Sequence, residues 1–412
     1  MHCRHCQAPL SYKWVDLGNS PPSNAYLDRA DLNRPETYFP LTVWVCEQCW
    51  LVQTEDYAKP EDIFNGQYAY FSSYSSSWLD HSYHYVESMV ERLSLDHNSM
   101  VVEIAANDGY LLQYVQARGI PCYGVEPTAS TAQAARHKNI EIIQDFFGST
   151  LAQNLSGQGK QADLIIANNV LGHVPDINDF ARGCHQLMKP NGVVTFEFPQ
   201  LTKISEQNQF DTIYHEHYSY LSLTAVQAIL SSAGMNIFDV QELNTHGGSL
   251  RVFAERADSG IRHAPDCALE RVASFLRREE SMGLKSRSFY AGFQARVNRT
   301  KNELVAFLID LAKQGKTIGA YGAAAKGNAL LNFSGVRPDL LPWVVDRNPS
   351  KQNKFLPGSH IPIVKEEVLF QEKPEYILIL PWNLRQEIEE QLSYTRNWGA
   401  TFVIAIPQLT FF

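Results

Sequence analysis

The stretch MVVEIAANDGYLLQYVQA (residues 100–117) decides the fold class of this 412-residue chain. It opens with the apolar run Met100–Ile104, which predicts a buried strand, and continues with small and polar residues over 105–110. The segment Leu111–Ala117 then predicts a helix. A strand, a short turn and a helix in this order let a ligand approach backbone amides at the carboxyl end of the strand. The turn lacks G-x-G-x-x-G, so by itself it is a weak signal for a bound cofactor.

Short apolar runs alternate with helix-like stretches along most of the remaining chain. In the middle of the chain the predicted strands are Met100–Ile104, Cys122–Val125, Ile140–Ile143, Asp163–Ala167, Gly192–Phe198 and Leu250–Ala254. Ala257–Pro265 resembles a linker, and Glu270–Gln314 predicts a long helix or a pair of helices. The later predicted strands are Thr317–Tyr321, Trp343–Val345, Tyr376–Leu380 and Thr401–Ile406. We therefore predict an α/β protein with a small module at 1–70, a Rossmann-like domain at 71–255 and a second, smaller Rossmann-like α/β domain at 256–412.

Acidic and polar residues follow successive predicted strands of the middle domain. Glu126 comes after the second strand, about 20 residues beyond the turn, where a carboxylate accepts hydrogen bonds from two ribose hydroxyls. Asp145 and Phe146 follow the third strand, where an acid and an aromatic ring suit a purine. Chance placement of acids at strand ends is the competing explanation. The order of features favours S-adenosylmethionine (SAM) over NAD, because the nicotinamide fingerprint is missing. The predicted cofactor-binding residues are Glu103, Ala105, Asn107, Gly109, Glu126, Pro127, Asp145, Phe146 and Asn169.

The N-terminal module carries two cysteine pairs, Cys3-x-x-Cys6 and Cys46-x-x-Cys49. Two thiolates three positions apart in a tight turn occupy two corners of a tetrahedron, and a second pair completes a zinc site. Free thiols or a redox pair are the alternative, although a redox motif needs only one pair. Four protein ligands leave no open position on the metal, so we predict a structural zinc ion (Zn2+).

The segment FDTIYHEHYSY (residues 210–220) is the densest group of titratable side chains in the chain. His215 and His217 are possible metal ligands, but no HExxH helix is present and the zinc ion already has four thiolates. Proton chemistry is the alternative, in which a histidine removes a proton while tyrosine and glutamate orient it or stabilise an oxyanion. A polar surface loop is the third interpretation.

Across nearly its whole length the chain resembles the SAM-dependent sugar C-methyltransferases that act on nucleotide-linked 4-keto deoxysugars. The resemblance rests on the two cysteine pairs and on the segments YAYFSSYSSS, VVEIAANDGYLL, GVEP, DFF, NNVLGHVPDI, FDTIYHEHYSYLS, HGGSLRV, YGAAAKGNALLNFSG, PGSHIPI and ILPWN. It implies that the middle domain has the class I methyltransferase fold. The cofactor turn has fewer glycines than in many methyltransferases, but turns of this kind are common in the family.

The resemblance also implies a mechanism. His217 would be the general base that removes the hydrogen on carbon 3 of a dTDP-linked 4-keto-6-deoxysugar, giving an enolate that attacks the SAM methyl group. Glu216 would hold the His217 ring, and Tyr214 would lie against the sugar. The residues that correspond to further sugar or enolate contacts are Tyr68 and His173.

The same resemblance implies that the C-terminal domain binds part of the sugar nucleotide. Lys326 and the exposed amides of the turn after the strand at 317–321 suit a pyrophosphate, and Asp346 suits a ribose. The segment His246–Arg251 is expected near the active cleft. The predicted substrate-binding residues are Tyr74, Tyr321, Lys326, Asn328, Asp346 and Asn383. Without the resemblance, this domain could equally be a Rossmann repeat that binds nothing.

Composition excludes several classes of protein. Hydrophobic residues make up 44% and charged residues 19%, which excludes a mostly disordered chain. Thirty-five basic against 44 acidic residues give a net charge of −9, so we expect no nucleic-acid partner. The apolar runs are far too short to span a membrane, and no secretory signal is visible, so we expect a cytoplasmic protein with reduced cysteines and no membrane partner. A monomer is expected because three domains would dock within one chain.

Two other functions stay open at the level of the sequence. The first is a nicotinamide-dependent sugar-nucleotide oxidoreductase that uses one of the two α/β domains, which the absent G-x-G-x-x-G disfavours. The second is a zinc-ribbon binding module without enzyme activity, which would leave the cluster at 210–220 without a role.

Overall fold

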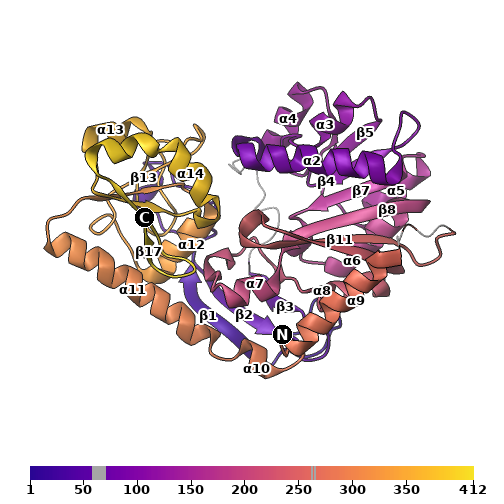
Figure 1. Cartoon of the computed structure of the whole chain (residues 1–412), viewed down its shortest axis with the longest axis horizontal. Coiled ribbons are helices and arrows are strands. Elements are labelled where there is room, and N and C mark those ends of the chain that lie inside the picture. The colour runs from indigo at the N-terminus through magenta and orange to yellow at the C-terminus, as the bar shows by residue number, and fades with distance from the viewer. Residues whose placement is uncertain (58–70, 261–262, 264–265) are drawn as a thin grey trace.

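The computed structural model describes residues 1–57, 71–260, 263 and 266–412 (Figure 1). Within these ranges the strands form three sheets: a central sheet of seven strands, a C-terminal sheet of six and an N-terminal sheet of four. Figure 1 shows the C-terminal sheet on the left and the central sheet on the right, with the N-terminal strands between them below. None of the helices in the described ranges is long and apolar enough to cross a membrane.

The central sheet has the strand order β10-β11-β8-β7-β4-β5-β6. Its strands are β4 (Val101–Ile104), β5 (Cys122–Val125), β6 (Glu141–Ile143), β7 (Ala162–Asn168), β8 (Met188–Pro199), β10 (Met235–Leu243) and β11 (Ser249–Arg256). Helices around it are α2 (Ser76–Leu93), α3 (Leu112–Ala117), α4 (Ala129–His137), α5 (Ser149–Gly157), α6 (Ile177–Leu187), α8 (Leu223–Ser232) and α9 (Asp266–Ser281). β4 pairs in parallel with β5 on one side and with β7 on the other. The strand order therefore reverses at β4, where open α/β sheets bind their ligands.

The C-terminal sheet repeats this arrangement on a smaller scale. Its strands are β12 (Ile318–Tyr321), β13 (Val344–Val345), β14 (Ile363–Val364), β15 (Tyr376–Ile379), β16 (Thr401–Ile404) and β17 (Thr410–Phe411). β12 pairs in parallel with both β13 and β15, so this sheet also has a reversal point. Its helices are α11 (Phe293–Lys313), α12 (Ala325–Ser334), α13 (Glu367–Glu372) and α14 (Arg385–Gln391). The predicted α/β fold with two Rossmann-like units is confirmed.

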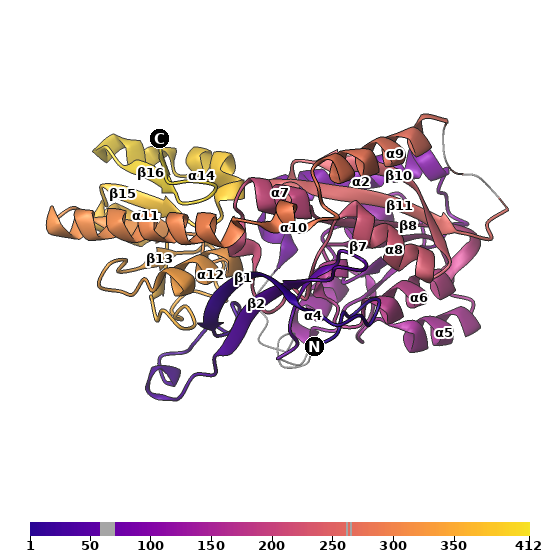
Figure 2. The same ribbon diagram turned by 90° about the horizontal axis from the view of Figure 1, so that it is seen from below.

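The N-terminal sheet is antiparallel and includes a strand from far along the chain. β1 (Tyr12–Ser20) pairs with β2 (Phe39–Val45), and β2 pairs with β3 (Val52–Thr54). The fourth strand is β9 (Ser219–Tyr220), which pairs with β3 through Val52 and Tyr220. Figure 2 shows the β1–β2 hairpin extending away from the central sheet, beside α11 and α12. The N-terminal module is thus completed by the end of the segment at 210–220.

The structure differs from the sequence predictions at the edges of the central unit. β10 was not predicted, because it is an edge strand whose exposed face carries polar residues such as Gln241 and Glu242. The predicted helical region at 270–314 contains α9, the short α10 (Arg287–Tyr290) and α11. Our boundary at residue 256 assigns α9 to the C-terminal domain, but α9 packs against β10 and α8 of the central unit.

Candidate active site and zinc site

The turn between β4 and α3 follows a backbone path that favours glycine. Ala105, Asn107 and Gly109 have φ angles of 59°, 49° and 73°, in the left-handed region. Glycine adopts that region without a penalty and asparagine tolerates it, so Ala105 is the residue that costs about 1 kcal/mol or more of strain. Strained backbone of this kind concentrates at ligand sites, where it exposes backbone amides. The shape of a glycine-rich cofactor turn is therefore present without its sequence.

Glu126, at the end of β5, holds the cofactor turn in place. One carboxylate oxygen accepts the backbone N–H of Asn107 at 2.9 Å, and the other accepts the backbone N–H of Thr128 at 2.9 Å and the hydroxyl O–H of Thr131 at 3.0 Å. Burial raises the pKa of the Glu126 carboxyl. Glu103 lies fully buried on β4, where burial raises the pKa of its carboxyl well above the usual range. Glu126 thus supports the turn directly through Asn107.

The other predicted cofactor residues follow the same edge of the sheet. Pro127 is half-buried after Glu126, and Asp145 and Phe146 are exposed after β6, where Asp145 accepts the backbone N–H of Phe146. Asn169 follows β7 with a φ of 53°. The structure therefore brings the predicted residues to the carboxyl ends of four adjacent strands, as parallel pairing requires.

A segment that precedes α2 covers the turn. The backbone N–H of Ser72 donates to the Asn107 side chain at 2.9 Å, and that of Ser73 donates to Asp108 at 3.3 Å. Tyr74, which we predicted to bind substrate, lies at the end of this segment with 59% of its surface exposed. Tyr68 lies outside the described residues.

Gly124→Ala is expected to weaken both folding and cofactor binding. A methyl group on Gly124 of β5 would lie 2.5 Å from the Cβ atom of Ala106 in the cofactor turn and 2.7 Å from Ile142. Overpacking of this size costs about 1–3 kcal/mol, and here it displaces the turn itself. The melting temperature and the affinity for SAM should both fall. Gly157→Ala is the matched control, because nothing lies within 4 Å of its added methyl group, and it should change neither quantity.

His217 lies in the loop between η4 (Phe210–Thr212) and β9, and one of its ring nitrogens is fixed. Nδ1 lies 2.6 Å from the Thr212 carbonyl oxygen, which can only accept, so Nδ1 carries the proton and Nε2 has a lone pair. Tyr214 lies against the ring with 3.9 Å between ring centres, and His173 meets it edge-on at 4.5 Å. The pKa of His217 lies well below its usual value. Burial has the largest effect, and the neighbouring His173 has the next largest. The ring is therefore a neutral base at neutral pH.

His173 connects this base to the central sheet. It lies in η3 (Leu171–His173), which follows Asn169 at the end of β7. Burial lowers the pKa of His173 to about 4, so it too is neutral. Because β7 is adjacent to β4, the base and the cofactor turn lie at the carboxyl ends of neighbouring strands.

The structure corrects the predicted role of Glu216. One of its oxygens accepts the backbone N–H and the side-chain N–H of Asn24, each at 3.1 Å. The carbonyl of Thr212, rather than Glu216, orients the His217 ring. Glu216 instead ties the loop that carries His217 to the N-terminal module. The neighbouring His215 contacts the carbonyl of Pro40 at 3.2 Å, so consecutive side chains of this loop serve different purposes.

Several residues around His217 come from distant segments. His246, in η5 (Thr245–Gly247), lies with Nε2 3.1 Å from Nδ2 of Asn169, and its ring packs 4.9 Å from that of Trp78 on α2. His246 therefore contacts Asn169, one of the predicted cofactor residues. Sequence reasoning missed Trp78, because a buried tryptophan in a helix looks like an ordinary core residue.

The C-terminal sheet also contacts the segment that carries His217. The Trp382 ring in η6 (Trp382–Leu384) donates its Nε1 proton to Asp211 at 2.7 Å, and burial raises the pKa of Asp211 to about 6. Asp211 was not singled out from the sequence, although it precedes Thr212 directly. Asn383, a predicted substrate residue, is half-buried beside Trp382.

Two predicted substrate residues of the C-terminal domain have other partners. Asn328 is fully buried and donates to the Ser23 carbonyl at 3.2 Å, so it joins the C-terminal sheet to the N-terminal module instead of facing a ligand. Tyr321 is buried in the C-terminal core, where its hydroxyl reaches Gln391 at 3.4 Å. Asp346 remains at the sheet edge, where it accepts the backbone N–H groups of Ala323 and Asn348, each at 2.8 Å.

The four cysteines of the N-terminal module come together. All four sulfur atoms lie within 4.8 Å of one another, with 3.5 Å between Cys3 and Cys49 and between Cys6 and Cys46. A tetrahedral zinc ion with bonds of about 2.3 Å separates its ligands by about 3.8 Å, so the donor set fits zinc. The side-chain amide of Gln53 donates to the Cys3 sulfur at 3.3 Å, as expected for an outer partner of a ligand.

The zinc site is connected to the base through β3. The Thr54 hydroxyl, at the end of β3, donates to the His217 carbonyl at 3.1 Å. Arg4, next to Cys3, donates to the carbonyls of Thr54 and Pro175, each at 2.8 Å, and lies over the Tyr218 ring. The metal site therefore supports the backbone on which His217 is placed.

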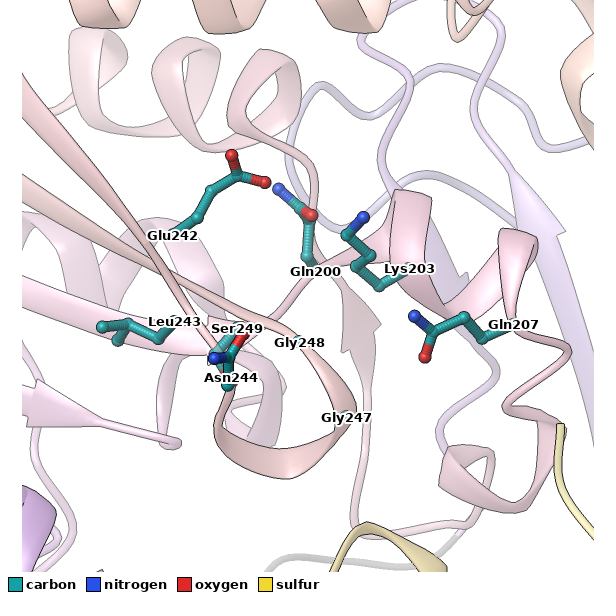
Figure 3. Close-up of a pocket in the computed structure, with 9 residues that line it drawn as sticks. All are labelled: Gln200, Lys203, Gln207, Glu242, Leu243, Asn244, Gly247, Gly248 and Ser249. Carbon is teal, nitrogen blue, oxygen red and sulfur yellow. The ribbon is translucent and has the colours of Figure 1, made fainter.

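A pocket of about 450 Å³ lies beside η5 (Figure 3). Figure 3 shows it between the loop at Gly247 and Gly248 on one side and Gln200, Lys203 and Gln207 on the other. None of the predicted catalytic or cofactor residues lines it. It is adjacent to the site around His217 without being part of it.

Comparison with known proteins covers the whole chain. Three family models match: "Putative zinc binding domain" at 3–64, "Methyltransferase domain" at 78–240 and "C-methyltransferase C-terminal domain" at 244–407. The C-methyltransferase NovU of Streptomyces niveus is 33% identical over 409 residues, which are 98% of this chain and 95% of that protein. A ubiquinone biosynthesis O-methyltransferase of Escherichia coli is 24% identical over 35% of this chain and 65% of its own length. The crystal structure of a SAM-dependent methyltransferase from Clostridium acetobutylicum aligns with a TM-score of 0.35 and 14% identity, over 42% of this chain and 90% of that one.

Proposed function

This chain belongs to the family of SAM-dependent C-methyltransferases, and from that premise we propose that it methylates carbon 3 of a dTDP-linked 4-keto-6-deoxysugar in deoxysugar biosynthesis. The nicotinamide-dependent oxidoreductase and the zinc-ribbon module without activity are wrong, because the relatives and the family models are those of methyltransferases. Zinc and SAM are the metal and the methyl donor that the two N-terminal family models and the cysteine cluster support.

The state of His217 is the observation that carries the proposal. Transfer to a saturated carbon requires that a carbon-bound hydrogen be removed, and a neighbouring carbonyl group makes such a hydrogen acidic enough for a base to remove it near neutral pH. His217 supplies a neutral, buried imidazole with Nδ1 anchored on Thr212 and Nε2 able to accept the proton. When bound, SAM would supply an electrophilic methyl group, and the residues of the cofactor turn would hold it.

The remaining residues support this chemistry by their positions. Tyr214 packs against the His217 ring with the two ring planes tilted by 35°, and the resemblance implies that it lies against the sugar. His173, neutral and edge-on to His217, is placed to donate a hydrogen bond to an oxygen of the sugar. These roles follow the resemblance stated above, and the contacts are consistent with them.

We assign the nucleotide end of the substrate to the reversal point of the C-terminal sheet. The turn that follows β12 leads into α12, whose N-terminus offers backbone amides for a phosphate. Asp346 ends the neighbouring strand β13, as an acid that binds a ribose does in Rossmann-like sheets. We also propose that the protein acts as a monomer, since the parts of the site come from one chain; light scattering would test this.

The assay that tests the function uses methyl-labelled SAM and a panel of 4-keto nucleotide sugars. The expected product carries one added methyl group, and carbon-13 NMR should place the label on carbon 3. A label on oxygen, or no transfer to any 4-keto sugar, would contradict the proposal. Replacing the 4-keto group by a hydroxyl in the matched substrate should abolish transfer, because the hydrogen on carbon 3 is then no longer acidic.

The pH dependence of the reaction should reflect the environment of His217. Burial and neighbouring positive charge disfavour the imidazolium, so the pKa of His217 lies well below the usual 6.5. Only the neutral ring can accept a proton, and the rate therefore falls as pH drops through that lowered pKa. We expect kcat/KM to stay level below pH 6.5 before it declines. A decline centred at or above pH 6.5 would show that the base is less buried, or is another group.

A further inference from the structure

Lys326 lies close to the reacting region. It is in the first turn of α12, and its ammonium group donates to the His246 carbonyl at 3.3 Å and lies 5.2 Å from the centre of the Trp382 ring. α12 packs against η4, which contains Asp211 and Thr212. The helix that carries Lys326 therefore contacts the segment that anchors His217.

The ammonium group has donors to spare. Among the described residues no carboxylate lies within 4.0 Å of it, and the His246 carbonyl accepts only one of its three protons. Asp211 is the acid whose charge acts on Lys326, but one oxygen of Asp211 is already bonded to Trp382. A half-buried ammonium with unused donors is suited to an anionic ligand.

Lys326 is also a cation whose charge acts on His217, with its own pKa lowered by burial and raised by the charge of Asp211. The groups that face His217 are His173 from η3, His246 from η5, Lys326 from α12, the Thr212 carbonyl from η4, and the rings of Tyr214 and Tyr220. His173 and His246 are neutral at pH 7, since burial lowers the pKa of each to about 4. The positive charge that acts on His217 therefore comes from Lys326.

We propose that Lys326 is a catalytic residue that holds the oxygen on carbon 4 while His217 removes the hydrogen from carbon 3, instead of binding the pyrophosphate as predicted from the sequence. The inference rests on the proposed function. Nε2 of His217 takes the proton, the C–H electron pair forms the double bond between carbons 3 and 4, and the carbonyl pair moves to the oxygen held by Lys326. When carbon 3 bonds the methyl group, the carbonyl re-forms and the C–S electrons remain on the departing sulfur. His217 then releases its proton to solvent.

Lys326→Met tests this assignment with two readouts. Loss of one oxyanion donor lowers kcat by about 10²–10³-fold, with little change in KM for the nucleotide sugar. Removal of the positive charge also raises the pKa of His217, so the acidic limb of kcat/KM moves to higher pH. Carbon-13 NMR of labelled histidine in the enzyme without substrate should show the same upward shift, with the His217 signal identified from His217→Gln.

Matched variants separate the catalytic role from a structural one. Lys326→Arg keeps the positive charge. The acidic decline of kcat/KM should therefore stay at the wild-type pH, and kcat should be partly restored relative to Lys326→Met. Lys203→Met removes a half-buried lysine beside Gly248 (Figure 3) and should leave both readouts unchanged. An increase in KM with unchanged kcat and pH limb would overturn the assignment in favour of pyrophosphate binding. Wild-type enzyme that methylates no 4-keto sugar would overturn the proposed function itself, whereas an active wild type and a fully active Lys326→Met would overturn only the role of Lys326.

Discussion

His217→Gln is expected to lower methyl transfer by about 10²–10⁴-fold, the usual contribution of a positioned general base. Glutamine can still donate to the Thr212 carbonyl, so the loop keeps its anchor, but its amide is not basic enough to take a proton from carbon. Binding of SAM should not change, because the cofactor turn between β4 and α3 is a different segment from the loop that carries His217. Turnover by product mass and SAM affinity by calorimetry measure the two quantities.

His215→Gln is the matched control, two positions away in the same loop. Its ring contacts the Pro40 carbonyl and packs edge-on to Phe39, both of which belong to the N-terminal module. Because glutamine can keep the contact with Pro40, we expect near-normal turnover. Equal losses in the two variants would show that the loop tolerates no substitution, and full turnover of His217→Gln would reject the base.

Loss of the zinc site is expected to have the second large effect. Cys46→Ser removes one of four ligands, and structural zinc contributes about 10–16 kcal/mol in small zinc-binding peptides, as much as the whole stability of a typical domain. Without the zinc ion, β3 is no longer held in place. The hydrogen bond from the Thr54 hydroxyl to the His217 carbonyl is then lost as well. A shift of about 1 Å in the base costs about 10²-fold in rate.

Three measurements check the zinc prediction together. Elemental analysis should find one zinc ion per chain in wild type and none in Cys46→Ser, proteolysis should cleave the N-terminal module of the variant, and turnover should fall. Cys267→Ser changes an exposed cysteine outside the cluster and should alter none of them. A folded, zinc-free protein with normal turnover would contradict both the metal site and its connection to the base.

Much of the fold could be predicted because it is encoded locally. Strands β4, β5 and β7 are largely buried on both faces of a parallel sheet, so each appears in the sequence as a mostly apolar run. The edge strand β10 is partly polar, and β9 has only two residues, so neither has such a pattern. The antiparallel pairing of β9 with β3 joins residues far apart in sequence and could not be inferred from either segment.

The candidate site was partly predictable for the same reason. Residues that follow strands reach one edge of a sheet whatever their side chains do, so Glu126 and Asn169 could be placed from the sequence. The side-chain and backbone partners of these residues inside the site could not be predicted from the sequence. The contact of His217 with a backbone carbonyl leaves no sequence signal, and Glu216 looked like its partner only because it is adjacent. The position of Lys326 near the base depends on how α12 packs against η4, which is a tertiary contact.

Solvent exchange into the substrate is the most direct test of proton removal from carbon by His217. The enzyme is incubated in D2O with the 4-keto nucleotide sugar and demethylated SAM, so that no methyl group can be transferred, and proton NMR follows carbon 3. Wild-type enzyme should replace the hydrogen on carbon 3 by deuterium, and His217→Gln should not. Exchange that is just as fast in His217→Gln, or that is absent from an active wild type, would contradict the account.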